Sequence, residues 1–117
     1  MSNIDSKEIE SFLHGQLECW NAGDRDGFFA HYRSVAPNGL EIEYLGRPVV
    51  EGFSVLENMW EQQNSKFIVE VELSIIAANE AACHHRNVMR DGSGVIETIE
   101  LYKFDQGKTL VRYFIKQ

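Results

Sequence analysis

Apolar residues recur along this chain with two different periods. Three segments carry apolar side chains three or four residues apart, which is typical of helices with one buried stripe. Five other segments alternate between apolar and polar residues or are rich in β-branched residues, which is typical of strands. The predicted helices are Ser6–Asn21, Arg25–Arg33 and Gly52–Gln63, and the predicted strands are Leu40–Leu45, Phe67–Ala77, Ala81–Arg90, Val95–Phe104 and Thr109–Lys116.

The order of these elements predicts the class of fold. Two helices, a strand and a third helix come before four strands joined by short turns. Helices grouped ahead of an antiparallel meander are typical of an α+β fold in which the helices cover one face of a curved sheet. At 117 residues the chain fits one domain, spanning residues 1–117.

The predicted strand Val95–Phe104 has apolar residues on both of its faces, for example Tyr102 on one and Leu101 on the other. A sheet with one face in water alternates more strictly. We therefore expect a second copy of the chain to cover the outer face, giving a homodimer. The alternative is the ordinary surface hydrophobicity that folded proteins tolerate.

The net charge argues against two classes of binding partner. Eighteen acids against eleven bases give a net charge of −7, which argues against nucleic acid and anionic membranes as partners. The N-terminus lacks the apolar segment of a signal peptide, so we expect a cytoplasmic protein. Cys19 and Cys83 are far apart in the sequence and form no CxxC motif, so we expect both to be buried free thiols. The sequence contains no spacing typical of metal ligands.

Polar residues that interrupt apolar patterns are the candidates for a functional site. Glu100 lies between Ile99 and Leu101, and Gln16 falls on the apolar stripe of the first predicted helix. Burying such groups without partners is costly, so each either faces a pocket or has a structural partner. For Gln16 the alternative is a core amide bonded to backbone. Glu43, on the first predicted strand, either acts as a pocket base or faces water.

If Glu100 faces the interior, its neighbours on adjacent strands become candidates as well. We expect these interior neighbours to be Cys83, His85, Asn87 and Met89 on one adjacent strand, and Arg112, Phe114 and Lys116 on the other. An imidazole such as that of His85 suits proton transfer near neutral pH. Arg112 offers a structural alternative, because an ion pair with Glu100 would hold that acid ionised.

Large apolar side chains on the helices are predicted to form the core, and some of them to wall a cavity. These residues are Trp20, Phe28, Tyr32, Phe53, Met59 and Trp60. Tyr44 and Tyr113 are expected on the faces opposite Glu43 and Arg112, and they are left outside the predicted site.

The chain contains the motifs WNAGDRDGFFAHY, LGRPVVEG, ANEAA and LYKFDQGKTLV. Together they resemble the nuclear transport factor 2-like superfamily, which includes ketosteroid isomerases, scytalone dehydratases and SnoaL-like polyketide cyclases. The resemblance covers nearly the whole chain. It implies a cone-shaped α+β fold, a cystatin-like roll in which a curved antiparallel sheet wraps around the helices. This scaffold hosts enzymes and binding proteins alike.

Within the superfamily, one series of motifs is most similar in its spacing to the bacterial ketosteroid isomerases. The series comprises NAGD-x-DG, Glu43 three residues before Gly46, the EG that leads into the third predicted helix, and ANEAA. That resemblance implies that Glu43 stands at the place of the general base. It also implies that Glu100 stands at the place of a second acid, which is kept protonated by an apolar site. Gln16 stands where those enzymes carry a tyrosine that donates to the oxyanion, and an amide N–H donates more weakly.

The leading hypothesis is therefore an isomerase- or cyclase-like enzyme with a small-molecule pocket. Glu43 would move a proton next to a carbonyl, while Gln16, Glu100 and His85 would stabilise the developing enolate oxygen. No metal or organic cofactor is expected. One alternative is a non-catalytic ligand-binding or accessory protein with the same pocket, and another is a protein-interaction module.

Overall fold

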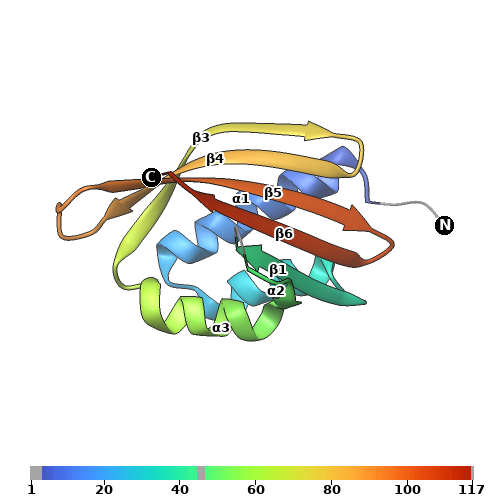
Figure 1. The fold of residues 1–117 in the computed structure, drawn as a ribbon, viewed down its shortest axis with the longest axis horizontal. Helices are drawn as coiled ribbons and strands as arrows, with labels where there is room; N and C mark the ends of the chain where they lie inside the picture. The colour runs from blue at the N-terminus through green and yellow to red at the C-terminus, as the bar shows by residue number, and fades with distance from the viewer. Residues whose placement is uncertain (1–3, 45–46, 117) are drawn as a thin grey trace.

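Three helices lie against one face of a six-stranded sheet (Figure 1). The computed structural model describes residues 4–44 and 47–116. The helices are α1 (Ser6–Ala22), α2 (Arg25–Val35) and α3 (Gly52–Gln63). The strands are β1 (Gly39–Tyr44), β2 (Val50–Glu51), β3 (Phe67–Ala77), β4 (Glu80–Met89), β5 (Val95–Asp105) and β6 (Lys108–Ile115). Every predicted helix and strand is confirmed to within two residues, except that Leu45 lies outside the described residues.

Side chains at the helix ends explain where the helices begin. Asp5 accepts from the Glu8 backbone N–H at 2.8 Å, and Glu8 reaches back to Asp5, which makes a capping box for α1. Gly23 ends α1 with φ 73°, a left-handed conformation that glycine adopts without steric cost. Asp24 then caps α2 through the N–H of Gly27 at 3.0 Å.

The sheet runs in the order β2-β1-β6-β5-β4-β3. The last four strands form the predicted antiparallel meander, with a bulge between Val71 and Leu73. One pair differs, because β1 lies parallel to β6 and makes the sheet mixed. The α+β fold with a curved sheet around the helices is confirmed.

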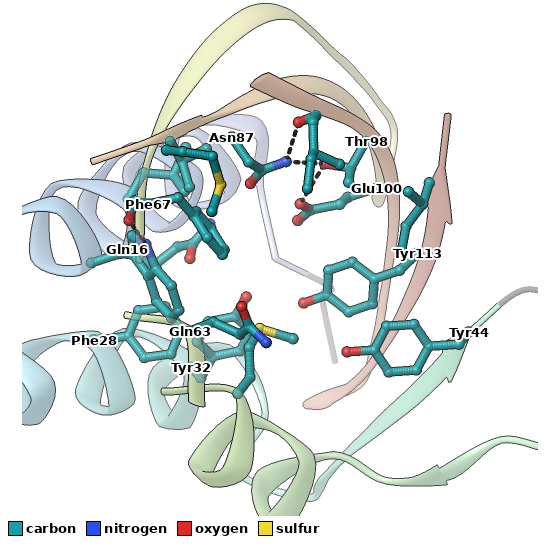
Figure 2. A pocket seen from close by; sticks show the side chains of 17 residues that line it. Gln16, Phe28, Tyr32, Tyr44, Gln63, Phe67, Asn87, Thr98, Glu100 and Tyr113 are labelled. Atoms are coloured by element: carbon teal, nitrogen blue, oxygen red, sulfur yellow. Dashed lines mark hydrogen bonds between the residues drawn. The ribbon is translucent and has the colours of Figure 1, made fainter. Parts of the chain in front are cut away.

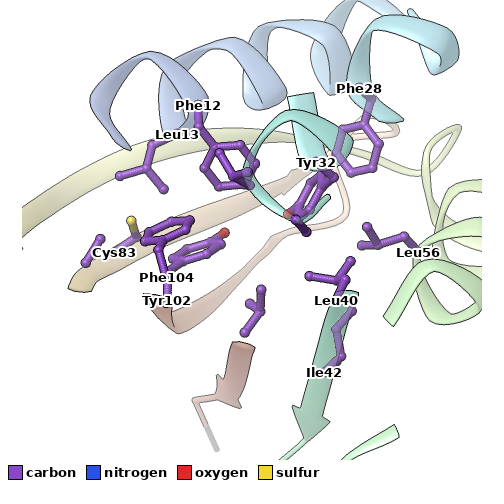
Figure 3. Close-up of a cluster of buried hydrophobic side chains, with 14 of the residues drawn as sticks. Phe12, Leu13, Phe28, Tyr32, Leu40, Ile42, Leu56, Cys83, Tyr102 and Phe104 are labelled. Atoms are coloured by element: carbon purple, nitrogen blue, oxygen red, sulfur yellow. The ribbon is translucent and has the colours of Figure 1, made fainter. Parts of the chain in front are cut away.

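Aromatic side chains fill the space between the sheet and helices α1 and α2 (Figure 3). The ring of Phe12 meets Tyr32, Tyr102 and Phe104 edge-on, with centroids 4.9, 5.8 and 5.8 Å apart. Edge-to-face contacts of this kind stabilise aromatic pairs beyond their buried area. This cluster fills the part of the roll next to β5, and the remaining interior is left to a cavity.

No helix of the described residues covers the outer face of the sheet (Figure 1). Leu73, Ile75 and Ile99 are exposed on that face. The homodimer predicted from the sequence stays a prediction. None of the helices in the described residues has the length and apolar character needed to span a membrane.

Candidate active site

A cavity of about 300 Å³ lies between the helices and the concave face of the sheet (Figure 2). Most of its wall is apolar or aromatic. The helices contribute Gln16, Leu17, Trp20, Phe28, Tyr32, Met59 and Gln63. The strands contribute Tyr44, Phe67, Val69, Asn87, Met89, Ile96, Thr98, Glu100, Tyr113 and Ile115. This size lies at the lower end for pockets that bind small organic molecules.

Glu100 lies in this wall, and its carboxyl group is held by three side chains. The Tyr102 hydroxyl donates to Glu100 Oε1 at 2.5 Å. His85 Nδ1 forms a hydrogen bond with Oε2 at 2.9 Å, and the Thr98 hydroxyl donates to the same oxygen at 3.5 Å. Glu100 is 9% exposed and His85 1%, so both groups of this pair are withdrawn from bulk water.

A second layer of hydrogen bonds fixes Thr98. The Asn87 side-chain amide donates to the Thr98 hydroxyl at 3.1 Å and to the Ile96 carbonyl at 2.8 Å (Figure 2). Because the Thr98 oxygen accepts from Asn87, its own hydrogen is available for Glu100. Asn87, Thr98 and Glu100 therefore form one chain of hydrogen bonds along the cavity wall.

Two tyrosines line the cavity next to Glu100, one on the adjacent strand β6 and one on β1 beyond it. Tyr113 lies opposite Glu100 in the β5–β6 ladder, and Tyr44 lies next to Tyr113 on β1. Their rings stack with centroids 5.3 Å apart, and both hydroxyls point into the cavity (Figure 2). Burial raises the pKa of both hydroxyls, and the negative charge of Glu100 adds to this effect. Both phenols therefore stay protonated and can donate hydrogen bonds at neutral pH.

The electrostatics of the cavity are one-sided. Among the described residues of its wall, Glu100 is the one carboxyl group, and there is no lysine, arginine or histidine. Burial also raises the pKa of the adjacent Cys83 thiol to about 12, again with a contribution from Glu100. Within residues 4–44 and 47–116, no group of three or more potential ligands is placed to hold a metal ion.

Most of the predicted site residues face the cavity. They are Gln16, Glu100, Trp20, Phe28, Tyr32, Met59, Asn87 and Met89. His85 lies behind Glu100 instead of in the wall itself. Phe53 and Trp60 pack against the core, where the Trp60 ring meets Trp20 at 5.2 Å. The predicted roles of these residues in binding or catalysis remain predictions.

Three predicted site residues lie on the other side of the sheet. Glu43 and Arg112 pair with each other on the outer face, with Nε of Arg112 3.2 Å from Glu43 Oε2. The Arg112 guanidinium also lies over the Phe114 ring, 5.2 Å from its centroid. The expectation that Glu43, Arg112 and Phe114 face the pocket is wrong, and so is the alternative of a Glu100–Arg112 ion pair.

The turn between β5 and β6 gives the physical reason. Gln106 and Gly107 form a two-residue turn with φ values of 51° and 80°, and this turn pairs Asp105 with Lys108. Counting from that pair places Tyr113 opposite Glu100, and Arg112 opposite Leu101. Tyr113 and Tyr44 therefore belong to the site, although the sequence analysis left them outside it. A two-residue turn at Gln106 and Gly107 would have predicted this register from the sequence.

No family model and no curated protein matches the sequence, but solved structures do. A putative SnoaL-like polyketide cyclase from Jannaschia sp. CCS1 has a TM-score of 0.71 and 20% identity, covering 99% of this chain and 90% of its own. A cystatin-like protein of unknown function from Methylobium petroleophilum PM1 has a TM-score of 0.76 and 15% identity, covering 99% and 80%. An NTF2-like protein of unknown function from Burkholderia xenovorans LB400 has a TM-score of 0.74 and 14% identity, covering 95% and 84%.

Proposed function

Starting from the nuclear transport factor 2-like fold of this chain, we propose an enzyme that moves a proton next to a carbonyl group of a small molecule whose uncharged part occupies the cavity, without a cofactor. Glu100 is the base in this proposal. One observation carries it: among the described residues, a single carboxyl group faces a mostly apolar cavity, and three side chains hold it there.

The contacts of Glu100 suit a base. An ionised carboxylate is a pure acceptor, and each of its three partners has a hydrogen to offer when His85 carries one on Nδ1. Two carboxylate oxygens have about four acceptor positions, so one position remains for a proton taken from a ligand. Glu100 could then return this proton, or one that it has exchanged with water, to a carbon of the enolate.

Tyr113 and Tyr44 complete the proposed reaction. Removing a proton next to a carbonyl places negative charge on the carbonyl oxygen, and donors aimed at that oxygen lower the barrier. Both phenols point into the same cavity as Glu100 and stay protonated because burial raises the pKa of each. Gln16 offers a third donor from α1. In this proposal the two phenols replace Glu100 in the donor role that the resemblance implied for it, and Gln16 keeps the donor role expected from the sequence analysis.

His85 is a positioning residue in this scheme. It does not line the cavity, and its ring holds Glu100 Oε2 at 2.9 Å from behind. Because Tyr102 bonds the other oxygen, the two contacts together hold the carboxyl group in one orientation. Preorganisation of this kind lowers the cost of reaching the reactive geometry.

Hydrogen–deuterium exchange tests the proposal without knowledge of the product. The protein is incubated in D₂O with a panel of enolisable ketones of one or two rings, such as 2-tetralone, and deuterium at the α-carbon is followed by NMR. We expect catalysed exchange with at least one compound and a loss of about 10²–10⁴-fold in Glu100→Gln, the range for a lost general base. Glu43→Gln, an acid on the outer face, should keep the wild-type rate.

Full exchange activity in Glu100→Gln would exclude Glu100 as the base. The ligand-binding alternative makes a different prediction. Panel compounds would then bind, as seen by titration of tryptophan fluorescence, but no deuterium would enter in wild type or variant.

A further inference from the structure

A second hollow adjoins the cavity. It has a volume of about 660 Å³ and lies between α3 and Arg47, Pro48 and Val50. Three residues line both hollows, namely Tyr44, Met59 and Gln63. The two spaces are therefore neighbours, with these three side chains between the cavity and the groove.

The side of α3 that faces the groove has an unusual composition. Ser54, Asn58 and Gln62 follow one another at intervals of four residues, so they form a single stripe on the helix. All three are exposed, whereas α3 buries Gly52 and Leu56 on its core side. This stripe presents a hydroxyl and two amides, which can donate as well as accept hydrogen bonds.

The charge of the groove is opposite to that of the cavity. Arg47 is the one ionised side chain among the described residues that line the groove, and it is exposed. The whole chain carries a net charge of −7, and the cavity carries the carboxyl group of Glu100. A groove with a cation and no acid therefore stands out against the rest of the molecule, and it favours an anionic group.

We propose that the groove binds the anionic tail of the molecule whose neutral ring system occupies the cavity. The ligand class is an elongated compound with an apolar ring head and a carboxylate, sulfonate or similar group that reaches Arg47. The assignment of the head to the cavity rests on the proposed function, but binding of the tail does not require turnover. Repulsion from Glu100 keeps the anionic end out of the cavity and fixes the orientation of the ligand.

Two fluorescent probes that differ in one charged group test this proposal. They are 6-(p-toluidino)-2-naphthalenesulfonate, whose sulfonate lies at the far end of an elongated ring system, and its neutral analogue N-(p-tolyl)-2-naphthylamine. We expect Arg47→Gln to weaken binding of the sulfonate about threefold to tenfold, the range for one exposed charge-assisted contact, and to leave the neutral probe within about twofold. Arg33→Gln removes an exposed arginine from α2 and should change neither dissociation constant by more than about twofold.

A second variant approaches the same site without touching Arg47. Asn58→Asp adds an acid to the exposed stripe of α3 and should weaken the sulfonate selectively by a similar factor. Equal losses for both probes, no loss in either variant, or the same selective loss in Arg33→Gln would overturn the proposal.

The outcomes remain distinguishable from those of the exchange assay. If Arg47→Gln does not weaken the sulfonate selectively but deuterium exchange still depends on Glu100, the anion-binding role of the groove is rejected and the proposed function stands. If Arg47→Gln weakens the sulfonate selectively but no exchange occurs, the anion-binding role stands and the catalytic role of Glu100 is rejected.

Discussion

At the scale of single residues, Glu100 is defined by the groups that hold it. A buried carboxyl group is costly unless hydrogen bonds replace the water it loses. Tyr102 and His85 supply the two shortest of these bonds, at 2.5 and 2.9 Å, and Asn87 acts indirectly through Thr98. The polar residues therefore stabilise the fold and orient the proposed base at the same time.

Removing the Tyr102 hydroxyl tests whether its hydrogen bond to Glu100 stabilises the fold. Tyr102→Phe should lower the free energy of unfolding by about 1.5–3 kcal/mol, the range for a hydrogen bond to a charged group. Urea denaturation measures this loss. In a double-mutant cycle the loss should shrink in the Glu100→Gln background, because the charged acceptor is gone. Tyr44→Phe is the matched control, since that phenol lines the cavity without a described bond to Glu100.

An undiminished loss in the Glu100→Gln background would contradict the coupling of the two residues.

Sequence reasoning found some of the site residues and missed others for identifiable reasons. Gln16 and Glu100 stood out because a polar group in an apolar pattern needs an explanation. Tyr44 and Tyr113 gave no such signal, since a tyrosine suits a core, a surface or a pocket equally well. Glu43 was placed in the site by resemblance, yet alternation along β1 sends its side chain to the face opposite Tyr44.

At the scale of elements, local signals predicted nearly all of the helices and strands. Periodicity, caps and turn residues are local properties, so they can be read from short windows. The parallel pairing of β1 with β6 could not be read in this way, because the two strands lie about 70 residues apart in the chain and no short turn joins them. That pairing decides which side chains of β1 meet Tyr113, and hence the composition of the site.

The start of α3 carries a prediction that depends on pH. The Glu51 carboxylate accepts from the backbone N–H groups of Phe53 and Ser54 at 2.6 and 2.9 Å, and these bonds lower its pKa. Its contribution is present above the ordinary value of 4.5 and is lost as pH falls through the lowered pKa of the folded chain. Glu51→Ala should therefore cost about 1 kcal/mol of unfolding free energy at pH 7, and less in acid.

Thermal or urea unfolding at pH 7 and pH 3 measures the difference. Glu57→Ala, an exposed acid later in the same helix, should show no comparable dependence on pH. A loss in Glu51→Ala that stays constant between the two pH values would show that the charge of the cap contributes nothing.

At the scale of the whole molecule, the two faces of the sheet have different environments. The concave face is filled by the helices, the aromatic core and the cavity. On the outer face, two rows of cross-strand neighbours remain uncovered by any described helix. One row comprises Leu73, His84, Ile99 and Phe114, and the next comprises Ile75, Ala82, Leu101 and Arg112.

We propose that this outer face joins two copies of the chain. Leu73, Ile75 and Ile99 are 57%, 56% and 40% exposed, and covering them would remove apolar area from water. Sedimentation velocity at micromolar concentration should show a dimer for the wild type. Ile99→Lys should give a monomer, because it would place a charge in the centre of the apolar contact. Val49→Lys changes an equally exposed apolar residue, 42%, outside these rows and should leave the dimer intact. A wild-type monomer would leave the exposed rows as ordinary surface, whereas dissociation by both variants would place the contact elsewhere.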